Sequence, residues 1–193
     1  MDRNDRSAMD KWFPLRTPRL LLREFVATDE ADVHEYGSDP EVCRYDVWGP
    51  NTPQQTRDVL ASRLAAQSVW PRDEIELAVE LLAERKMIGS LRLHVTDPQR
   101  ENAEIGWVFH RAYWGNGYAT EAASAVLDCA FGRLGLRRVY ASCDVRNVGS
   151  WRVMEKLGMS REGYSIKDKL QKGEWRDSYL YAILAPDRRS KRV

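Results

Sequence analysis

Residues 110–123 read HRAYWGNGYATEAA, and the rest of the chain is arranged around this stretch. An apolar run, IGWVF at residues 105–109, precedes it, and small apolar residues recur at helical spacing after it. The pattern predicts a strand, a turn and a helix. Such a turn can bind phosphate, because Gly115 and Gly117 let a bulky anion approach the backbone and the first N–H groups of the helix. A plain strand-to-helix connection has the same pattern, so the turn alone does not decide.

Length and charge narrow the class of protein. The 193 residues suffice for one α/β domain with its own core, without need of a second domain. Thirty basic and twenty-nine acidic residues leave a formal charge of +1, which gives no electrostatic reason to bind nucleic acid or an acidic membrane. No apolar run approaches the ~20 residues of a membrane helix, and the N-terminus lacks the hydrophobic core of a signal peptide. We therefore expect a cytosolic protein that binds neither nucleic acid nor membrane.

The three cysteines, Cys43, Cys129 and Cys143, have no spacing typical of a metal site or a redox pair. Cys129 falls on the apolar face of a predicted helix, and Cys143 alternates within a predicted strand. Burial as small hydrophobic residues explains both positions. We expect neither a catalytic thiol nor a bound metal.

Hydrophobic periodicity predicts one domain over residues 17–185 with about seven strands. The order is a strand, two helices, a meander of three strands, the glycine turn with its helix, a fifth strand, a short helix and a closing pair of strands. The strands at 103–109 and 137–145 should be parallel neighbours, because a strand–helix–strand crossover makes them so. Residues 1–16 are expected as a loose arm, and residues 186–193 as a basic, solvated tail.

Four segments occur in the order of a known family. They are TPRLLLR at residues 17–23, AEIGWVFHRAYWGNGYATEA at 103–122, NVGSWRVMEKLGM at 147–159, and EG with GEWRDSYLYAIL within 162–184. Together they resemble the GNAT superfamily of acetyl-CoA-dependent N-acetyltransferases, and within it the RimJ/RimL branch of ribosomal-protein N-terminal acetyltransferases. The resemblance implies an α/β protein with the GNAT fold, a splayed, mixed and mostly antiparallel sheet with helices on both faces.

The family's pyrophosphate motif is Arg/Gln-x-x-Gly-x-Gly/Ala, matched here as Trp114-x-x-Gly117-x-Ala119. Tryptophan at the first position is usual in the branch, and it implies that one polar side-chain contact of the general motif is absent. The resemblance then implies that the turn holds the pyrophosphate mainly through backbone N–H groups. The turn residues are Gly115, Asn116, Gly117, Tyr118, Ala119 and Thr120. Trp114 could instead fill the core, and Tyr118 could mainly cover the loop.

The resemblance assigns the pantetheine arm of acetyl-CoA to the strand at residues 103–109. In the family this strand splays from the next one, and the arm lies between them like an added strand. The backbones of Trp107, Val108 and Phe109 would pair with its amides. An N–H near Val108 or Phe109 would polarise the thioester carbonyl. Gly106 suits a strand that another chain approaches closely.

Three polar residues are candidates for catalytic roles, Glu104 from its chemistry and Asn147 and Ser150 from the resemblance. Glu104 is the candidate base that accepts the amine's proton, directly or through a water, although it could be a surface residue of its strand. Asn147 would contact the pantetheine or the acceptor, and Ser150 would protonate or hydrogen-bond the departing thiolate. Both are also residue types suited to capping a helix.

Other residues have weaker assignments. Arg152 and Lys156 could reach the phosphates of the cofactor or could be solvated. Tyr45 and Trp48 belong to an aromatic loop that lies over the amine site in the family, and both could equally be core. Glu121 is expected to serve the helix near the favourable end of its dipole.

The expected reaction is direct transfer of acetyl from acetyl-CoA to a primary amine in a ternary complex, since no covalent nucleophile is evident. The preferred acceptor is a protein N-terminal α-amine, whose pKa of ~8 needs only a modest base. The alternative acceptor is a small amine, such as a polyamine, an amino acid or an aminoglycoside. An acyl-CoA-binding module without catalysis is the alternative from another class. The sequence leaves open whether the protein is a monomer or a homodimer.

Overall fold

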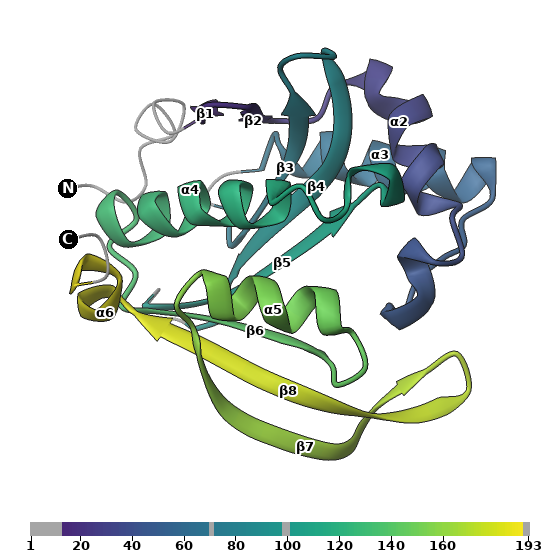
Figure 1. The fold of residues 1–193 in the computed structure, drawn as a ribbon. Coiled ribbons are helices and arrows are strands. Elements are labelled where there is room, and N and C mark those ends of the chain that lie inside the picture. The colour runs from purple at the N-terminus through teal and green to yellow at the C-terminus, as the bar shows by residue number, and fades with distance from the viewer. Residues whose placement is uncertain (1–12, 70–71, 98–100, 191–193) are drawn as a thin grey trace.

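The computed structural model describes residues 13–69, 72–97 and 101–190, which form a mixed sheet with helices on both faces (Figure 1). The strand order is β1-β2-β3-β4-β5-β6-β8-β7. All neighbours are antiparallel except β5 and β6, which are parallel as predicted. The strands are β1 (Leu15–Arg16), β2 (Leu20–Arg23), β3 (Glu74–Leu81), β4 (Lys86–Val95), β5 (Asn102–Phe109), β6 (Arg138–Asp144), β7 (Ser160–Gln171) and β8 (Glu174–Leu184).

The helices divide between the two faces of the sheet. Helices α4 and α5 pack on one face, and α2 and α3 pack on the other. The helices are α2 (Glu30–Gly37), α3 (Pro53–Ala66), α4 (Tyr118–Gly132), α5 (Val148–Lys156) and α6 (Ala185–Ser190), with 3-10 turns η1 (Ala27–Asp29), η2 (Val42–Tyr45) and η3 (Arg111–Tyr113). In the part of the chain that the structure describes, no helix is long and apolar enough to cross a membrane.

Alternation along the central strands separates two apolar layers. Leu77 and Val79 of β3 are buried in the larger layer, which includes the apolar side of α4. Ala78, between them, points to the other face and packs with Val33 of α2 and Leu60 of α3. The larger layer therefore supports α4 and α5, while the smaller layer holds the pair of helices that precedes the meander.

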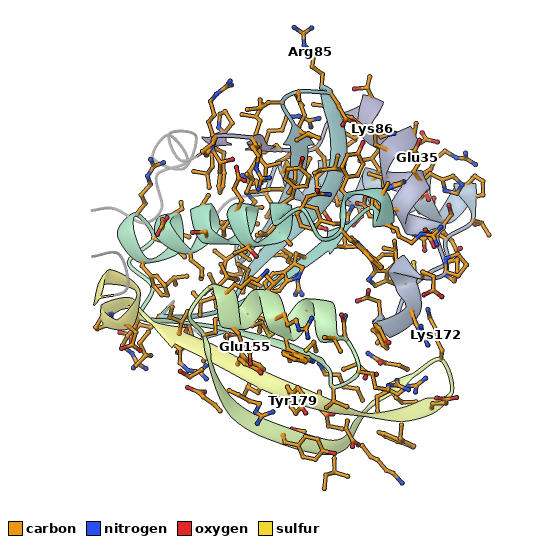
Figure 2. All side chains as sticks on the ribbon, in the orientation of Figure 1. Glu35, Arg85, Lys86, Glu155, Lys172 and Tyr179 are labelled. Atoms are coloured by element: carbon orange, nitrogen blue, oxygen red, sulfur yellow. The ribbon has the colours of Figure 1, made fainter. Side chains whose placement is uncertain are left out.

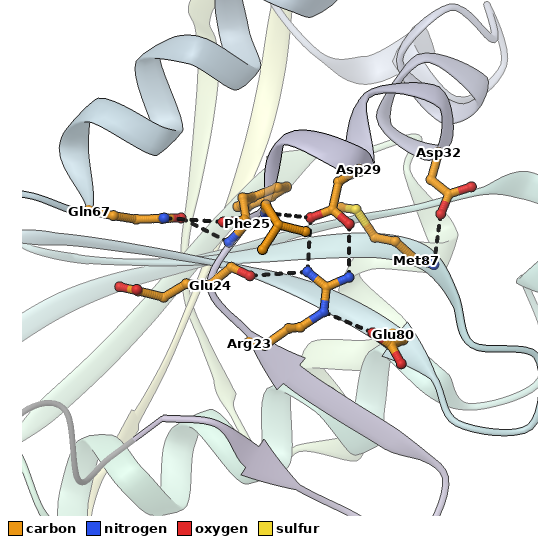
Figure 3. A network of polar contacts seen from close by, with 9 residues as sticks. Arg23, Glu24, Phe25, Asp29, Asp32, Gln67, Glu80 and Met87 are labelled. Carbon is orange, nitrogen blue, oxygen red and sulfur yellow. Dashed lines mark hydrogen bonds and ion pairs between the residues drawn. The ribbon is translucent and has the colours of Figure 1, made fainter.

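A polar network fastens α2 to the sheet (Figure 3). Arg23 of β2 donates to both carboxylate oxygens of Asp29 at 2.9 and 2.8 Å, and through Nε to Glu80 of β3 at 2.8 Å. The main-chain N–H of Met87, in β4, donates to Asp32 at 3.0 Å. These contacts join three strands to η1 and α2, so the helix is held in one position over the sheet.

Both ends of the chain differ from the sequence-based expectation. Residues 15–16 pair with β2 as β1, so the loose arm expected over residues 1–16 is wrong for its last two positions. Leu15 is buried in the larger core layer, which accounts for the pairing. Residues 185–190 form α6, where a solvated tail is predicted from residue 186 onward. Phe13, also within the expected arm, packs partly buried against the same core layer, and residues 1–12 and 191–193 lie outside the described part of the chain.

Candidate active site

Strands β5 and β6 separate soon after they meet. Three residue pairs join them, the last being Glu104 with Tyr140. Beyond Glu104 the described pairing of β5 continues with β4, and that of β6 continues with β8 as far as Asp144. Within the described residues, the facing edges of the two strands are therefore unpaired over the rest of their length. A splayed sheet of this kind fits the insertion of an extended, amide-bearing molecule.

Alternation along the β4–β5 ladder decides which backbone groups of β5 face this gap. His110 donates its N–H to a carbonyl of β4 at 2.9 Å, so Val108 and every second residue before it also bond to β4. The N–H and C=O groups of Trp107 and Phe109 then point away from β4, toward β6. Because the N–H of Val108 belongs to the ladder, Phe109 is left as the candidate donor to the thioester carbonyl.

The turn before α4 is built on two glycines with a left-handed backbone. Gly115 and Gly117 have φ of +79° and +80°, a region that a residue with a Cβ rarely adopts. Gly117 is the N-cap of α4, so the helix begins at Tyr118 rather than at about Asn116. Gly117 has no side chain to cap the helix, and the first N–H groups of α4 are therefore available to an anion.

Trp114 lies at the first position of the pyrophosphate motif, and its side chain is 49% exposed. The alternative interpretation of Trp114 as a core residue is therefore wrong. Its indole N–H donates to the carbonyl of Phe109 at 2.7 Å. This bond ties the turn to the end of β5 and uses a carbonyl that faces away from β4.

Arg19, which immediately precedes β2, lies against the same turn. Its Nη1 donates to the carbonyl of Asn116 at 3.0 Å, and its guanidinium lies 4.4 Å from the centroid of the Tyr118 ring. Its Nε donates to Glu121 at 2.6 Å. The motif gives no sign of Arg19, because the residue precedes Asn116 by 97 positions in the chain. The sequence assigned Glu121 to its own helix, and the structure adds this contact with Arg19, which lies too far away in the chain for a local pattern to reveal.

The N-terminus of α5 lies beside the gap. Asn147 is its N-cap and accepts the main-chain N–H of Ser150 at 3.1 Å, so the capping interpretation of Asn147 is confirmed. Ser150 is close enough to hydrogen-bond the thiol of Cys143 in β6. Burial raises the pKa of this thiol to about 11, and the contact with Ser150 opposes the rise. Ser150 is thus placed over β6, beyond the last pairing with β5.

Glu104 lies on the opposite face of the sheet from Ser150, because its neighbour Ile105 faces the core under α4. Its carboxylate accepts a long hydrogen bond from the hydroxyl of Ser142 at 3.5 Å and lies 4.0 Å from Nη1 of Arg92. The side chain is 32% exposed, so water can reach it. Glu104 and Ser150 therefore approach the gap from its two sides.

The aromatic loop, which contains Tyr45 and Trp48, is held against the turn between β7 and β8. Gln171 donates to the carbonyl of Tyr45 at 3.0 Å, and Lys172 donates to a carbonyl of η2 at 2.6 Å (Figure 2). The ring of Tyr45 lies 5.7 Å from the guanidinium of Arg146, while Trp48 packs against the smaller core layer. Trp48 therefore has a partial core role, and both Tyr45 and Trp48 remain candidate contacts to an acceptor.

Two cations predicted to meet the cofactor lie on α5. Arg152 and Lys156 are both exposed and one helical turn apart. The guanidinium of Arg152 lies 5.6 Å from the Trp151 ring. Both can reach an anion that extends along the helix.

A surface hollow of about 430 Å³ lies elsewhere, between α5 and the last two strands. Its lining residues are Trp151, Glu155, Met159, Arg161, Tyr179 and Tyr181. Since none of these is a predicted cofactor or acceptor residue, the hollow does not mark the site described above.

The cysteines do not supply a nucleophile. Cys43, Cys129 and Cys143 are buried and form no disulfide. Burial raises the pKa of each thiol to about 11, so all three are protonated near neutral pH. Among residues 13–69, 72–97 and 101–190, no group of three His, Cys, Asp or Glu side chains is placed to hold a metal.

The splayed strands and the glycine turn before α4 are features expected of one class of protein, an acyltransferase that binds a long, diphosphate-bearing thioester. Residues 19–160 match the acetyltransferase (GNAT) domain family, and the chain belongs to this family. It is therefore an acetyl-CoA-dependent N-acetyltransferase, an enzyme rather than a non-catalytic acyl-CoA-binding module.

Similar proteins support this assignment. YnaD of Bacillus subtilis, an uncharacterized N-acetyltransferase, is 36% identical over 170 residues, which are 88% of this chain and 96% of its own. The crystal structure of a GNAT-family acetyltransferase from Bacillus anthracis has a TM-score of 0.81 at 38% identity, and the match covers 89% of this chain and 98% of that one. Spermidine N(1)-acetyltransferase of Escherichia coli K12 is 26% identical over 164 residues, 85% of each chain.

Proposed function

We propose that this enzyme acetylates the α-amino group of protein N-termini, as members of the RimJ/RimL branch do. The proposal includes the cytosol as its compartment and a monomer or homodimer as its assembly, both carried over from the sequence.

The charges on the acceptor side of the sheet carry the proposal. Carboxylates there already have cationic neighbours: Glu104 has Arg92 at 4.0 Å. Burial raises the pKa of Asp46, beside Tyr45, and the nearby Lys172 and Lys169 oppose that rise. A polyamine would need several unpaired carboxylates, whereas an N-terminal α-amine brings one charge and loses it before attack.

The residues on the two sides of the gap suit a direct transfer. Glu104 can take the amine's proton through a water. As nitrogen bonds to the acetyl carbon, the N–H of Phe109 can donate to the oxyanion that develops. The carbon–sulfur bond then breaks, and Ser150 can donate a hydrogen bond to the thiolate. The sulfur ends as a thiol, with the proton that the amine gave up.

A small-amine acceptor is the second candidate, and the E. coli spermidine acetyltransferase favours it because the match covers 85% of both chains. The test is release of CoA thiol from acetyl-CoA with two panels of acceptors. One panel holds short peptides with free Ala, Ser or Met N-termini, and the other holds polyamines, amino acids and aminoglycosides. Turnover with peptides alone supports the proposal. Turnover with small amines alone overturns the choice of acceptor and leaves the family assignment in place.

A further inference from the structure

The turn that binds the cofactor's diphosphate lacks the polar side chain of the general motif, because Trp114 occupies its first position. The one polar group of Trp114, its indole N–H, is bonded to the carbonyl of Phe109 at 2.7 Å. Gly115 and Gly117 both have left-handed backbones, and glycine alone does not hold a fixed conformation. The conformation of this turn therefore needs support from another part of the chain.

Arg19 reaches the turn from the N-terminal segment. Its Nη1 donates to the carbonyl of Asn116 at 3.0 Å, and its Nη2 lies 3.6 Å from the position that a Cβ would occupy on Gly117. The plane of the guanidinium is further fixed by the Tyr118 ring, whose centroid is 4.4 Å away. Arg19 thus packs directly behind the Asn116–Gly117 peptide.

Glu121 fixes Arg19 in turn. Its carboxylate accepts from Nε of Arg19 at 2.6 Å, from the main-chain N–H of Arg19 at 3.0 Å and from the hydroxyl of Thr17 at 2.6 Å. The Glu121 side chain is 17% exposed and that of Arg19 is 45% exposed, so the carboxylate is the shielded partner of this ion pair. Because Glu121 lies in the first turn of α4, the brace and the phosphate-facing N–H groups belong to one rigid unit.

The geometry of the peptide bond links this brace to the cofactor. In a planar trans peptide, the C=O of one residue and the N–H of the next point in opposite directions. Arg19 holds the Asn116 carbonyl on its own side, so the N–H of Gly117 points away from Arg19, out of the turn. An N–H fixed in this direction can donate to an anion without first having to reorient.

We propose that Arg19 and Glu121 form a brace that orients the Asn116–Gly117 peptide toward the diphosphate of acetyl-CoA. Both are positioning residues, since they act through the backbone of the turn. The inference rests on the acetyl-CoA dependence of the family and is independent of which amine is the acceptor.

The test compares three variants of the full chain, Arg19→Gln, Glu121→Gln and Arg16→Gln, by calorimetric titration with CoA, which needs no acceptor. Arg19→Gln should weaken CoA binding on the order of tenfold, the effect of losing one charge-assisted hydrogen bond. Arg16 lies on β1, is exposed, and points to the face opposite its buried neighbour Leu15. Arg16→Gln removes the same charge from the same segment and should bind CoA as the wild type does.

Glu121→Gln separates positioning from simple charge. It leaves the positive charge of Arg19 in place and removes a negative charge near the bound diphosphate, so electrostatics alone predicts tighter CoA binding. A brace predicts weaker binding instead, in the same direction as Arg19→Gln. The double variant should be little worse than the poorer single variant, because both changes remove one unit. Unchanged or tighter CoA binding by Glu121→Gln would overturn the proposal.

A second measurement excludes general damage to the fold. Acetyl-pantetheine carries the thioester but no diphosphate, so its kcat/KM should be unchanged in Arg19→Gln while the KM for acetyl-CoA rises. Equal losses with both thioesters would show that Arg19 merely supports the fold, and would contradict the inference. Arg19→Lys should restore part of the CoA affinity, since one ammonium can bond to Asn116 or to Glu121 but lacks the fork that spans both. If the wild type turned over no amine of either acceptor panel while the CoA titrations gave the expected results, the acceptor proposal would be refuted and the brace would stand.

Discussion

At the scale of single residues, Glu104 occupies the last position at which β5 and β6 pair, with its carboxylate on the face opposite α4 and α5. If Glu104 is the base, the change Glu104→Gln should lower kcat by about two orders of magnitude, the usual contribution of a positioned proton acceptor. Binding of CoA should be unaffected, because the cofactor's predicted contacts lie on the turn, on α5 and on the backbone of β5 beyond Glu104, and none involves the Glu104 side chain. Steady-state kinetics and calorimetric titration with CoA measure the two quantities separately.

Glu74→Gln is the matched control for this residue. Arg92 contacts both carboxylates, with its Nε at 2.9 Å from Glu74 and its Nη1 at 4.0 Å from Glu104. If Glu104→Gln acts only by releasing Arg92, then Glu74→Gln should reduce kcat by a similar amount. Similar losses in the two variants would therefore refute the role of Glu104 as base.

Local chemistry was predictable from the sequence at this scale, and distant contacts were not. The spacing of Gly117 and Ala119 located the turn, because left-handed backbone and free helical N–H groups depend on neighbouring residues. The exposure of Trp114 and its bond to Phe109 depend on how the turn folds back on β5. The position of Arg19 depends on how β2 pairs in the sheet and how α4 packs across it. No short motif encodes either.

At the scale of elements, two glycines on neighbouring strands have different roles. A Cβ on Gly89 of β4 would lie 2.3 Å from the carbonyl oxygen of Val108 and 2.9 Å from Cδ1 of Phe109, whereas a Cβ on Gly106 would meet nothing within 4 Å. We expect Gly89→Ala to destabilise the fold by about 1–3 kcal/mol, because the β4–β5 pair must separate to admit the methyl group. Gly106→Ala should stay within about 0.5 kcal/mol of the wild type.

Urea unfolding of both variants, followed by circular dichroism, tests this difference. An unchanged midpoint for Gly89→Ala would show that the close approach of β5 to β4 is not required. Gly106 shares the face of Glu104, so a loss of turnover in stable Gly106→Ala would place the acceptor over this part of β5. The sequence interpretation of Gly106 as a point of close approach would then apply to the acceptor rather than to the pantetheine arm.

The long elements were predictable because their periodicity is strong. Alternating apolar residues marked β3, β4 and β5, and small apolar residues at helical spacing marked α4. Strand β1 was missed because two residues carry no periodicity, and Leu15 is recognised as buried only when β2 is in place. The point where β5 leaves β6 is likewise a property of the sheet, since each strand keeps its alternation beyond Glu104 while its partners differ.

At the scale of the whole molecule, one carboxylate joins the start of the domain to its central helix. Glu121 accepts hydrogen bonds from Thr17 and Arg19, which precede it by 104 and 102 positions. The same carboxylate therefore contributes to the closure of the fold and to the geometry of the cofactor turn, which couples stability to cofactor binding.

This coupling predicts a specific dependence of stability on pH. Burial raises the pKa of Glu121, but the hydrogen bonds from Thr17 and Arg19 together outweigh it and lower that pKa below its usual value. A carboxyl group whose pKa is lower in the folded than in the unfolded state gives stability that is complete above the unfolded pKa, ~4.3, and is lost as pH falls through the folded pKa. Glu121→Gln should therefore be less stable than the wild type at pH 7, and the difference should shrink below about pH 4.

This difference is measured as the free energy of unfolding of the wild type and of Glu121→Gln. Both are unfolded in urea at several pH values between about 3 and 7, a range that includes the unfolded pKa. Glu41→Gln is the control, because Glu41 pairs with Arg44 at 3.5 Å where both side chains are more than half exposed, and such pairs contribute little. Its curve should run close to that of the wild type throughout. If the curves of Glu121→Gln and the wild type stay parallel down to the lowest pH, the carboxylate gains nothing on folding. In a separate measurement at pH 7, saturating CoA should widen the gap in stability between the wild type and Glu121→Gln, because the wild type is expected to bind CoA more tightly.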